Sequence, residues 1–212
     1  MGLFLDSANI DDVRSAVTLG FVTGVTTNPA LMAKTERPEI DIIHDILELT
    51  TGPIFYQVTA ENVAVRADQA RAISRLAPDR VVIKIPATTE NFSLAARLKK
   101  EGISCAITAV ASPSQVYIAT LVGAAYAAIY VSRLTKQLGD GIGILRDCVS
   151  IARKSPVRIL AASLKSVDEV IATIMTEVPD ITLPLELILK LGEHELSLKA
   201  IEEFSTTKRV IG

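Results

Sequence analysis

The sequence is poor in aromatic residues and in cysteine. Its 212 residues include no tryptophan, and aromatic side chains make up only 4% of the chain. Surfaces that bind single-stranded nucleic acid stack bases on such rings, so a surface of this kind is not expected. The two cysteines, Cys105 and Cys148, lie in a strand-like and a helix-like segment respectively. This placement predicts buried, reduced thiols rather than a disulfide framework.

An excess of charge of one sign is also missing. The chain carries 22 basic and 24 acidic residues, a net charge of −2, which gives no reason to expect nucleic acid or an anionic membrane as a partner. No apolar run reaches the length of a membrane span. The first residues show no basic segment followed by an apolar one, so we expect no signal peptide and a cytoplasmic location.

What the chain does contain is a regular alternation of short apolar strands and amphipathic helices. With 49% hydrophobic residues and no break in composition, it is expected to form one domain over residues 1–212. Eight strand–helix units favour a single-domain (β/α)8 TIM barrel, and an open doubly wound sheet is the alternative. The predicted strands are residues 2–6, 21–26, 54–58, 80–86, 103–108, 125–131, 157–162 and 180–184.

An extra helical segment follows the eighth unit. Residues 193–212 are predicted to form a C-terminal helix and tail, because apolar residues recur there at helical spacing. A helix outside the eight units must pack somewhere. We expect it to lie across the barrel or on a neighbouring subunit.

Lys84 lies in the fourth predicted strand, residues 80–86 with the sequence RVVIKIP. A charged ammonium is costly to bury without a partner, and desolvation lowers the pKa of a lysine by up to several units. The neutral amine is a nucleophile that attacks carbonyl groups to form Schiff bases. The alternative is a structural lysine whose ammonium reaches water at the strand end or pairs with a carboxylate.

The barrel prediction requires polar residues at the carboxyl ends of the strands, where barrel enzymes carry their active sites. Polar side chains do collect there, and they define the candidate site. Because side chains alternate along a strand, Lys84 is expected to share the barrel interior with Val82. The same alternation pairs Phe4 with Asp6, Phe55 with Gln57, and Ala106 with Thr108. The candidate site residues are Asp6, Thr27, Asn28, Gln57, Lys84, Thr108, Tyr130, Arg133, Ser163 and Lys165.

Each candidate also has a structural interpretation. Asp6 could serve only as the counter-ion of Lys84, and Asn28 could simply form the turn before a proline. Arg133 and Lys165 could be solvated loop residues, and the polar groups at other strand ends could satisfy one another. The gathering of so many polar strand ends around one buried lysine favours a functional site. The two histidines lie on helix-like segments, so a histidine-based metal site or catalytic triad lacks its parts.

Five segments of the sequence resemble the small transaldolase family, and they follow one another along nearly the whole chain. The family is a (β/α)8 barrel of class I aldolases and transaldolases, which form a Schiff base on a lysine without a metal or other cofactor. Its small members typically assemble as decamers of two pentameric rings. The segments are residues 5–6 (LD), 24–29 (GVTTNP), 82–86 (VIKIP), 130–133 (YVSR) and 160–163 (LAAS).

Two branches of this family differ at their strand ends. True transaldolases carry glutamate at the position of Gln57 and typically phenylalanine at that of Tyr130, whereas this chain is similar to the fructose-6-phosphate aldolase branch. Gln57 cannot take up a proton and can only orient a water molecule. The chain departs from that branch at residues 111–113 (ASP), at Ser132 and in a short tail after Phe204, which bears on donor and acceptor preference.

The resemblance implies a mechanism for carbohydrate metabolism. Lys84 would form the imine with a small hydroxyketone, with Asp6 assisting proton movement, while Tyr130 shuttles a proton through a water held by Gln57 and Thr108. The substrate-binding residues would be Thr27 and Asn28 for the donor, and Arg133, Ser163 and Lys165 for the phosphate of the aldehyde.

The reaction predicted first is reversible aldol cleavage of fructose 6-phosphate into dihydroxyacetone and glyceraldehyde 3-phosphate. The first alternative is a transaldolase that passes a dihydroxyacetone unit between sugar phosphates of the pentose phosphate pathway. The second, of another class, is a catalytically silent barrel that binds phosphosugars or serves as an assembly scaffold.

Overall fold

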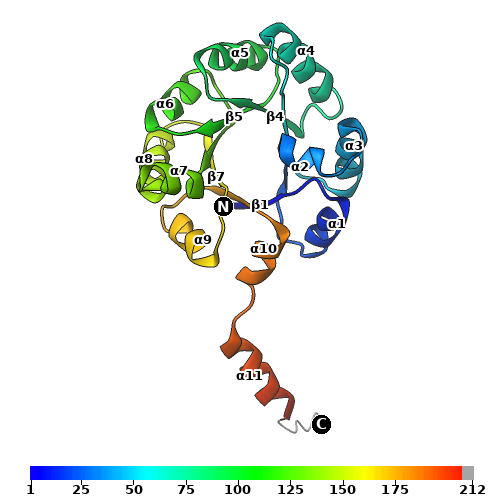
Figure 1. Cartoon of the computed structure of the whole chain (residues 1–212), viewed down its shortest axis with the longest axis vertical. Coiled ribbons are helices and arrows are strands. Elements are labelled where there is room, and N and C mark those ends of the chain that lie inside the picture. The colour runs from blue at the N-terminus through cyan, green and yellow to red at the C-terminus, as the bar shows by residue number, and fades with distance from the viewer. Residues whose placement is uncertain (207–212) are drawn as a thin grey trace.

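The alternating strands close on themselves in chain order. The computed structural model describes residues 1–206, and in it the eight strands form one closed barrel in which every neighbouring pair is parallel. The helices lie around the outside of this barrel (Figure 1). The predicted (β/α)8 architecture is therefore confirmed. The strands are β1 (Gly2–Asp6), β2 (Gly24–Thr26), β3 (Ile54–Gln57), β4 (Val81–Pro86), β5 (Cys105–Val110), β6 (Tyr126–Tyr130), β7 (Arg158–Ala162) and β8 (Asp180–Leu183).

Helices fill the connections between the strands. Short polar residues begin several of them: the Asn9 side chain accepts hydrogen bonds from the amides of Asp11 and Asp12, and Ser112 caps a helix whose first residue is Pro113. None of the helices in residues 1–206 is long and apolar enough to cross a membrane. The helices are α1 (Ile10–Thr18), α2 (Pro29–Ala33), α3 (Glu39–Leu49), α4 (Val63–Ser74), α5 (Thr89–Lys100), α6 (Pro113–Leu121), α7 (Val131–Leu138), α8 (Gly141–Ala152), α9 (Val167–Ile174), α10 (Leu185–Leu191) and α11 (Glu195–Thr206).

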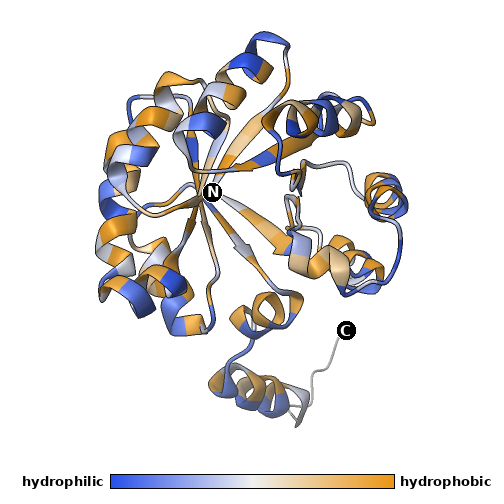
Figure 2. Cartoon of the chain, turned by 45° about the horizontal axis from the view of Figure 1, so that its top comes forward, coloured by the Kyte–Doolittle hydropathy of each residue, from blue (hydrophilic) through white to orange (hydrophobic). Residues whose placement is uncertain are grey.

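Two separate apolar layers hold the barrel together. The larger one lies between the strands and the surrounding helices, which carry both apolar and polar residues (Figure 2). The smaller one fills the barrel interior, where the rings of Phe4 and Phe55 meet edge to face at 5.4 Å. The predicted alternation of side chains along the strands is confirmed, because the expected residues form this inner cluster. Its members are Phe4, Phe55, Val82, Ala106, Ala128 and Leu160, with Tyr126 packed against them.

An ion pair closes the amino-terminal end of the barrel. The fully buried Asp180 accepts hydrogen bonds from two guanidinium nitrogens of Arg158, each at 2.6 Å, and from the amide of Gly2 at 2.9 Å. These contacts join β1, β7 and β8 below the inner cluster. The opposite end of the barrel carries the candidate site.

Several elements differ from the predictions. Strand β5 spans Cys105–Val110 rather than residues 103–108. Strand β2 begins at Gly24 rather than at residue 21, and Phe21 is 59% exposed in the irregular segment that precedes the strand. Helix α2 follows Asn28, where only a turn was predicted. The sequence did not reveal this helix, because five residues are too few to show helical periodicity. Helix α7 starts directly after β6, at Val131, which the prediction had placed in the strand.

The predicted C-terminal helix is present as α11, which projects away from the barrel (Figure 1). Four of its apolar residues are more than half exposed: Leu196, Leu198, Ile201 and Phe204. The predicted tail beyond Thr206 lies outside the described residues.

Candidate active site

A cavity of about 450 Å³ opens at the carboxyl ends of the strands. It contains every predicted site residue except Thr27, and these residues come from seven of the eight strands or the segments that follow them. The size is in the range of small-molecule binding sites. The predicted residues in its lining are Asp6, Asn28, Gln57, Lys84, Thr108, Tyr130, Arg133, Ser163 and Lys165.

Lys84 lies in the middle of β4 and points into the barrel interior. Its side chain is only 5% exposed, and its Nζ donates a hydrogen bond of 2.6 Å to the carbonyl of Thr27. Burial lowers the pKa of Lys84 to about 8, and the nearby carboxylate of Asp6 opposes part of that shift. About a tenth of this amine is therefore neutral at pH 7, and it faces the cavity.

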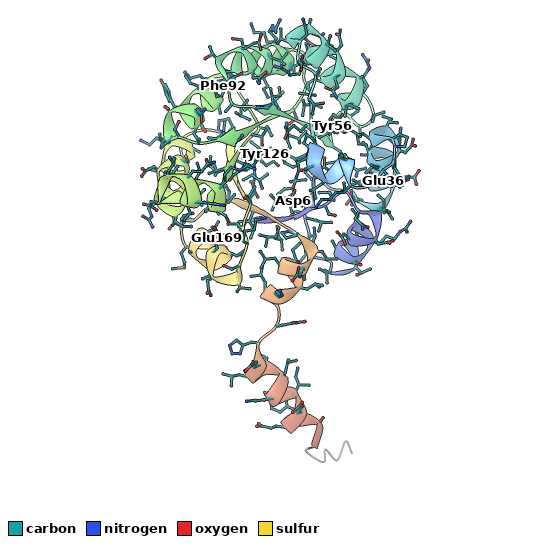
Figure 3. All side chains as sticks on the ribbon, in the orientation of Figure 1. Asp6, Glu36, Tyr56, Phe92, Tyr126 and Glu169 are labelled. Atoms are coloured by element: carbon teal, nitrogen blue, oxygen red, sulfur yellow. The ribbon has the colours of Figure 1, made fainter. Side chains whose placement is uncertain are left out.

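Asp6 occupies the end of β1, close to the centre of the barrel mouth (Figure 3). Its Oδ1 accepts a hydrogen bond of 2.8 Å from the hydroxyl of Thr26, which lies 2.7 Å from the hydroxyl of Thr182. Burial raises the pKa of Asp6, whereas the charge of Lys84 and the hydrogen bond from Thr26 act against this rise.

Asp6 is not simply the bonded counter-ion of Lys84. The hydrogen-bond partner of the ammonium in the described residues is the carbonyl of Thr27, and the carboxylate is bound by Thr26 instead. The two groups shift each other's pKa values while both remain open to the cavity. This arrangement allows Asp6 to exchange protons with a molecule bound at Lys84.

Thr108 and Tyr130 form a hydroxyl pair on the opposite side of the cavity. Their oxygens lie 2.8 Å apart. The pairing of β5 with β6 shifts register between Ile107 and Val110, and the intervening Ala109 has a left-handed φ of 55°. A bulge of this kind re-aims side chains at a strand end, which here brings Thr108 to Tyr130.

Gln57 lies beside Lys84, because the two residues are direct partners in the pairing of β3 with β4. Its side chain lines the cavity and forms no hydrogen bond with any other part of residues 1–206. The interpretation that Gln57, Thr108 and Tyr130 only satisfy one another is therefore wrong for Gln57. Its amide is available to a water molecule or a ligand.

Basic and hydroxyl groups gather on one side of the cavity mouth. The guanidinium of Arg133 stacks over the Tyr130 ring at 4.7 Å from its centre. Ser163, at the end of β7, has a left-handed φ of 63°, and the exposed Lys165 follows it. Two cations and a hydroxyl at the carboxyl ends of β6 and β7 can hold a phosphate group.

Asn28 and Thr27 also form hydrogen bonds that stabilise the fold. The Asn28 Oδ1 caps helix α2 by accepting the amide of Leu31 at 3.0 Å, so its amide nitrogen is the part left for a ligand. The Thr27 hydroxyl points away from the cavity and donates to the carbonyl of Phe55 at 2.8 Å. Only the Thr27 carbonyl reaches the site, through Lys84.

Two threonines in the cavity were not among the predicted residues. Thr26 and Thr182 are buried, line the cavity and connect Asp6 to β8. Inward alternation, applied to β2 and β8 as it was to β4, would have found both of them. Within residues 1–206 there is no group of three or more histidine, cysteine, aspartate or glutamate side chains arranged to hold a metal ion.

The geometry supports amine chemistry on a carbonyl substrate. A buried amine with a lowered pKa, a carboxylate with a raised pKa and a phenol share one cavity. Groups of this kind can form an imine and move the protons that its chemistry requires. The cations at the mouth favour a substrate with an anionic end.

The chain is similar in sequence to known proteins. A family profile described as Transaldolase/Fructose-6-phosphate aldolase matches residues 3–211 of the chain. Proteins named probable transaldolase from Heliobacterium modesticaldum, Desulforudis audaxviator and Symbiobacterium thermophilum are 36%, 33% and 34% identical to it. Each alignment covers 96% of this chain and 95% of the relative.

Proposed function

Because this chain belongs to the transaldolase/fructose-6-phosphate aldolase family, we propose that it is a class I aldolase acting on fructose 6-phosphate. The reaction is the reversible cleavage of this sugar into dihydroxyacetone, or a similar hydroxyketone, and glyceraldehyde 3-phosphate. The observation that carries the proposal is the buried amine of Lys84, with a pKa of about 8, facing a cavity lined by polar strand ends.

In the direction of synthesis, the neutral Nζ of Lys84 attacks the ketone carbon of the donor. The resulting carbinolamine loses water and becomes a protonated imine, which withdraws electrons from the adjacent carbon. That carbon loses a proton, and the enamine formed in this way attacks the aldehyde carbon of the acceptor. The new alkoxide takes up a proton, and water then hydrolyses the imine to release the product and free Lys84.

Asp6 serves the steps at the imine itself. Its raised pKa suits a carboxyl that gives a proton to the departing hydroxyl of the carbinolamine and takes one back during hydrolysis. Asp6 and the amide nitrogen of Asn28 also bind hydroxyl groups of the donor. Thr27 takes part through its carbonyl, which holds Nζ at the cavity wall.

Tyr130 transfers the protons that accompany formation and cleavage of the carbon–carbon bond. Its hydroxyl, paired with Thr108, exchanges a proton with the alkoxide and with the donor carbon through a water molecule that the Gln57 amide orients. Arg133, Ser163 and Lys165 receive the phosphate of the aldehyde. The enzyme needs no metal or other cofactor in this mechanism, because the protonated imine is the electron sink.

A second candidate function is supported by the names of the relatives. Proteins named probable transaldolase match almost the full length of the chain, so transfer of a dihydroxyacetone unit between sugar phosphates is the alternative reaction. In transfer, the enamine on Lys84 reacts with a second aldehyde. In cleavage, it is protonated instead, and hydrolysis of the imine releases the free ketone. Gln57 separates the two reactions, because a glutamate there can act as a base on the water and Gln57 cannot.

The test measures how one substrate is partitioned. Fructose 6-phosphate is supplied with and without a second aldehyde phosphate, and free dihydroxyacetone and transfer product are both quantified. We expect the wild type to release free dihydroxyacetone and Gln57→Glu to shift the ratio toward transfer. Wild-type enzyme that forms only transfer product, or a variant with an unchanged ratio, would contradict the assignment.

We also propose an assembly and a location. The resemblance points to a homodecamer or homopentamer in the cytoplasm, and the exposed apolar residues of α11 support packing of this helix on a neighbouring subunit. Light scattering during size-exclusion chromatography would test the assembly. A chain shortened after residue 192 should then assemble with fewer subunits, and an unchanged number of subunits would exclude α11 from the contacts.

A further inference from the structure

The carboxylate of Glu169 joins two of the strand ends that form the cavity mouth. Glu169 lies in the first turn of α9 (Figure 3). Its two oxygens lie 2.6 and 2.5 Å from the hydroxyl of Ser132, at the start of α7, and one of them accepts the amide of Lys165 at 2.8 Å. One side chain therefore connects the segment after β6 with the segment after β7.

Those two segments carry the basic groups of the mouth. Ser132 directly precedes Arg133, and Lys165 lies two residues after Ser163. In residues 1–206, these bonds of Glu169 are the only side-chain hydrogen bonds that link α7, by way of α9, to the segment between β7 and α9. Without this contact, Arg133 and Lys165 would depend on flexible side chains and on a strained backbone at Ser163 for their relative position.

Capping of α9 does not account for the contact. Ser166 and Glu169 have the spacing of a capping box, and the Ser166 hydroxyl accepts the Glu169 amide at 3.2 Å. In a capping box the glutamate returns to the amide of the capping serine itself. Here the Glu169 carboxylate instead bonds Lys165 and, across the gap between two βα units, Ser132.

We propose that Glu169 is a positioning residue for acceptor specificity: it sets the spacing of Arg133 and Lys165 so that together they bind the phosphate of an aldehyde phosphate. This inference rests on the proposed aldolase function. Glu169 does not touch the substrate, and it acts on Arg133 through Ser132 and on Lys165 through the backbone amide. Its contribution concerns the phosphorylated acceptor and leaves imine formation at Lys84 unchanged.

The experiment compares Glu169→Ala, Glu169→Gln and the wild type in aldol synthesis from dihydroxyacetone. The acceptor is glyceraldehyde 3-phosphate in one series and unphosphorylated glyceraldehyde in the other. Glu90→Ala is the matched control, because Glu90 also lies in the first turn of a helix, α5, and is absent from the cavity lining. Borohydride trapping of the dihydroxyacetone adduct, followed by mass spectrometry, is run on every variant.

For Glu169→Ala we expect KM for the phosphorylated aldehyde to rise about tenfold, with little change in KM for glyceraldehyde. The KM of Glu169→Gln should lie between those of Glu169→Ala and the wild type, because the side-chain oxygen of the glutamine can still accept the N–H of Lys165 and the hydroxyl of Ser132. Glu90→Ala should leave both KM values unchanged.

Equal changes for the two acceptors, or a change no larger than that of Glu90→Ala, would overturn the inference. Should Glu169→Ala fail to fold, Ser132→Ala cuts the same contact while preserving the bond to Lys165, and the same split in KM is expected. If the wild type forms no dihydroxyacetone adduct, the proposed aldolase function is refuted instead. Failure of the inference about Glu169 and failure of the proposed function are therefore distinguishable.

Discussion

The coupling between Asp6 and Lys84 leads to a prediction in which reactivity and turnover change in opposite directions. The charge of Asp6 favours the ammonium form of Lys84, so Asp6→Asn removes the group that opposes the fall in its pKa. We expect the titration midpoint of Lys84 to move below its value of about 8 in the variant. The amine becomes more available at neutral pH, while the carboxyl that assists loss of water from the carbinolamine is gone.

The size of the effect is bounded by the structure. At a pKa of about 8, about one tenth of Lys84 is neutral at pH 7, against about 0.03% for a lysine at its usual value of 10.5. Burial therefore increases the reactive fraction about 300-fold. Since about a tenth is already neutral, Asp6→Asn can raise this fraction at pH 7 by at most about tenfold, and it can add nothing well above pH 8.

The assay measures how fast Lys84 reacts with a small uncharged reagent that modifies amines, between pH 6 and 10. Mass spectrometry of the peptide that contains Lys84 follows the reaction. The wild type should show a midpoint near 8 and Asp6→Asn a lower one. Aldolase turnover of the variant should fall over the same range. A wild-type midpoint near that of an exposed lysine, or a variant midpoint that moves upward, would refute the reasoning.

Three further perturbations have expected outcomes. Tyr130→Phe should lower kcat by about 100-fold or more while the imine is still trapped by borohydride, and unchanged turnover would remove the phenol from proton transfer. Asp180→Ala should lower the free energy of unfolding by about 2–3 kcal/mol, because it removes the fully buried carboxylate that pairs with the Arg158 guanidinium and accepts one of the two hydrogen bonds of the Gly2 amide; urea denaturation measures this loss. Because unfolding raises the pKa of Lys84 from about 8 toward 10.5, the unfolded chain binds more protons in that window and stability rises with pH there. Lys84→Met should abolish that part of the rise, at most about 3 kcal/mol, in thermal unfolding measured across the window.

The barrel and its inward-facing side chains were predictable because both depend on simple periods. The alternation along β4 placed Val82 with Lys84, and the same reasoning placed Phe4 and Phe55 in the inner cluster. Strand ends collected into one cavity because all eight strands run parallel and their carboxyl ends share one face.

The remaining features depend on contacts between residues far apart in the chain. Thr27 carries a polar side chain at a strand end, yet its hydroxyl turns away and its carbonyl holds Lys84, which residue type alone does not reveal. The bond between Ser132 and Glu169 spans 37 positions and requires the packing of α7 beside α9 to be known. Helix α7 itself was missed because it follows β6 without an intervening turn or a side-chain cap.

The central claim is that Lys84 is the nucleophile, and the most direct measurement is reductive trapping of its imine. The protein is incubated with dihydroxyacetone and borohydride, and the modified peptide is identified by mass spectrometry beside a Lys84→Ala control. We predict one reduced dihydroxyacetone unit on Lys84 of the wild type and none on the variant. An unmodified wild type, or an equal adduct on Lys84→Ala, would contradict the mechanism.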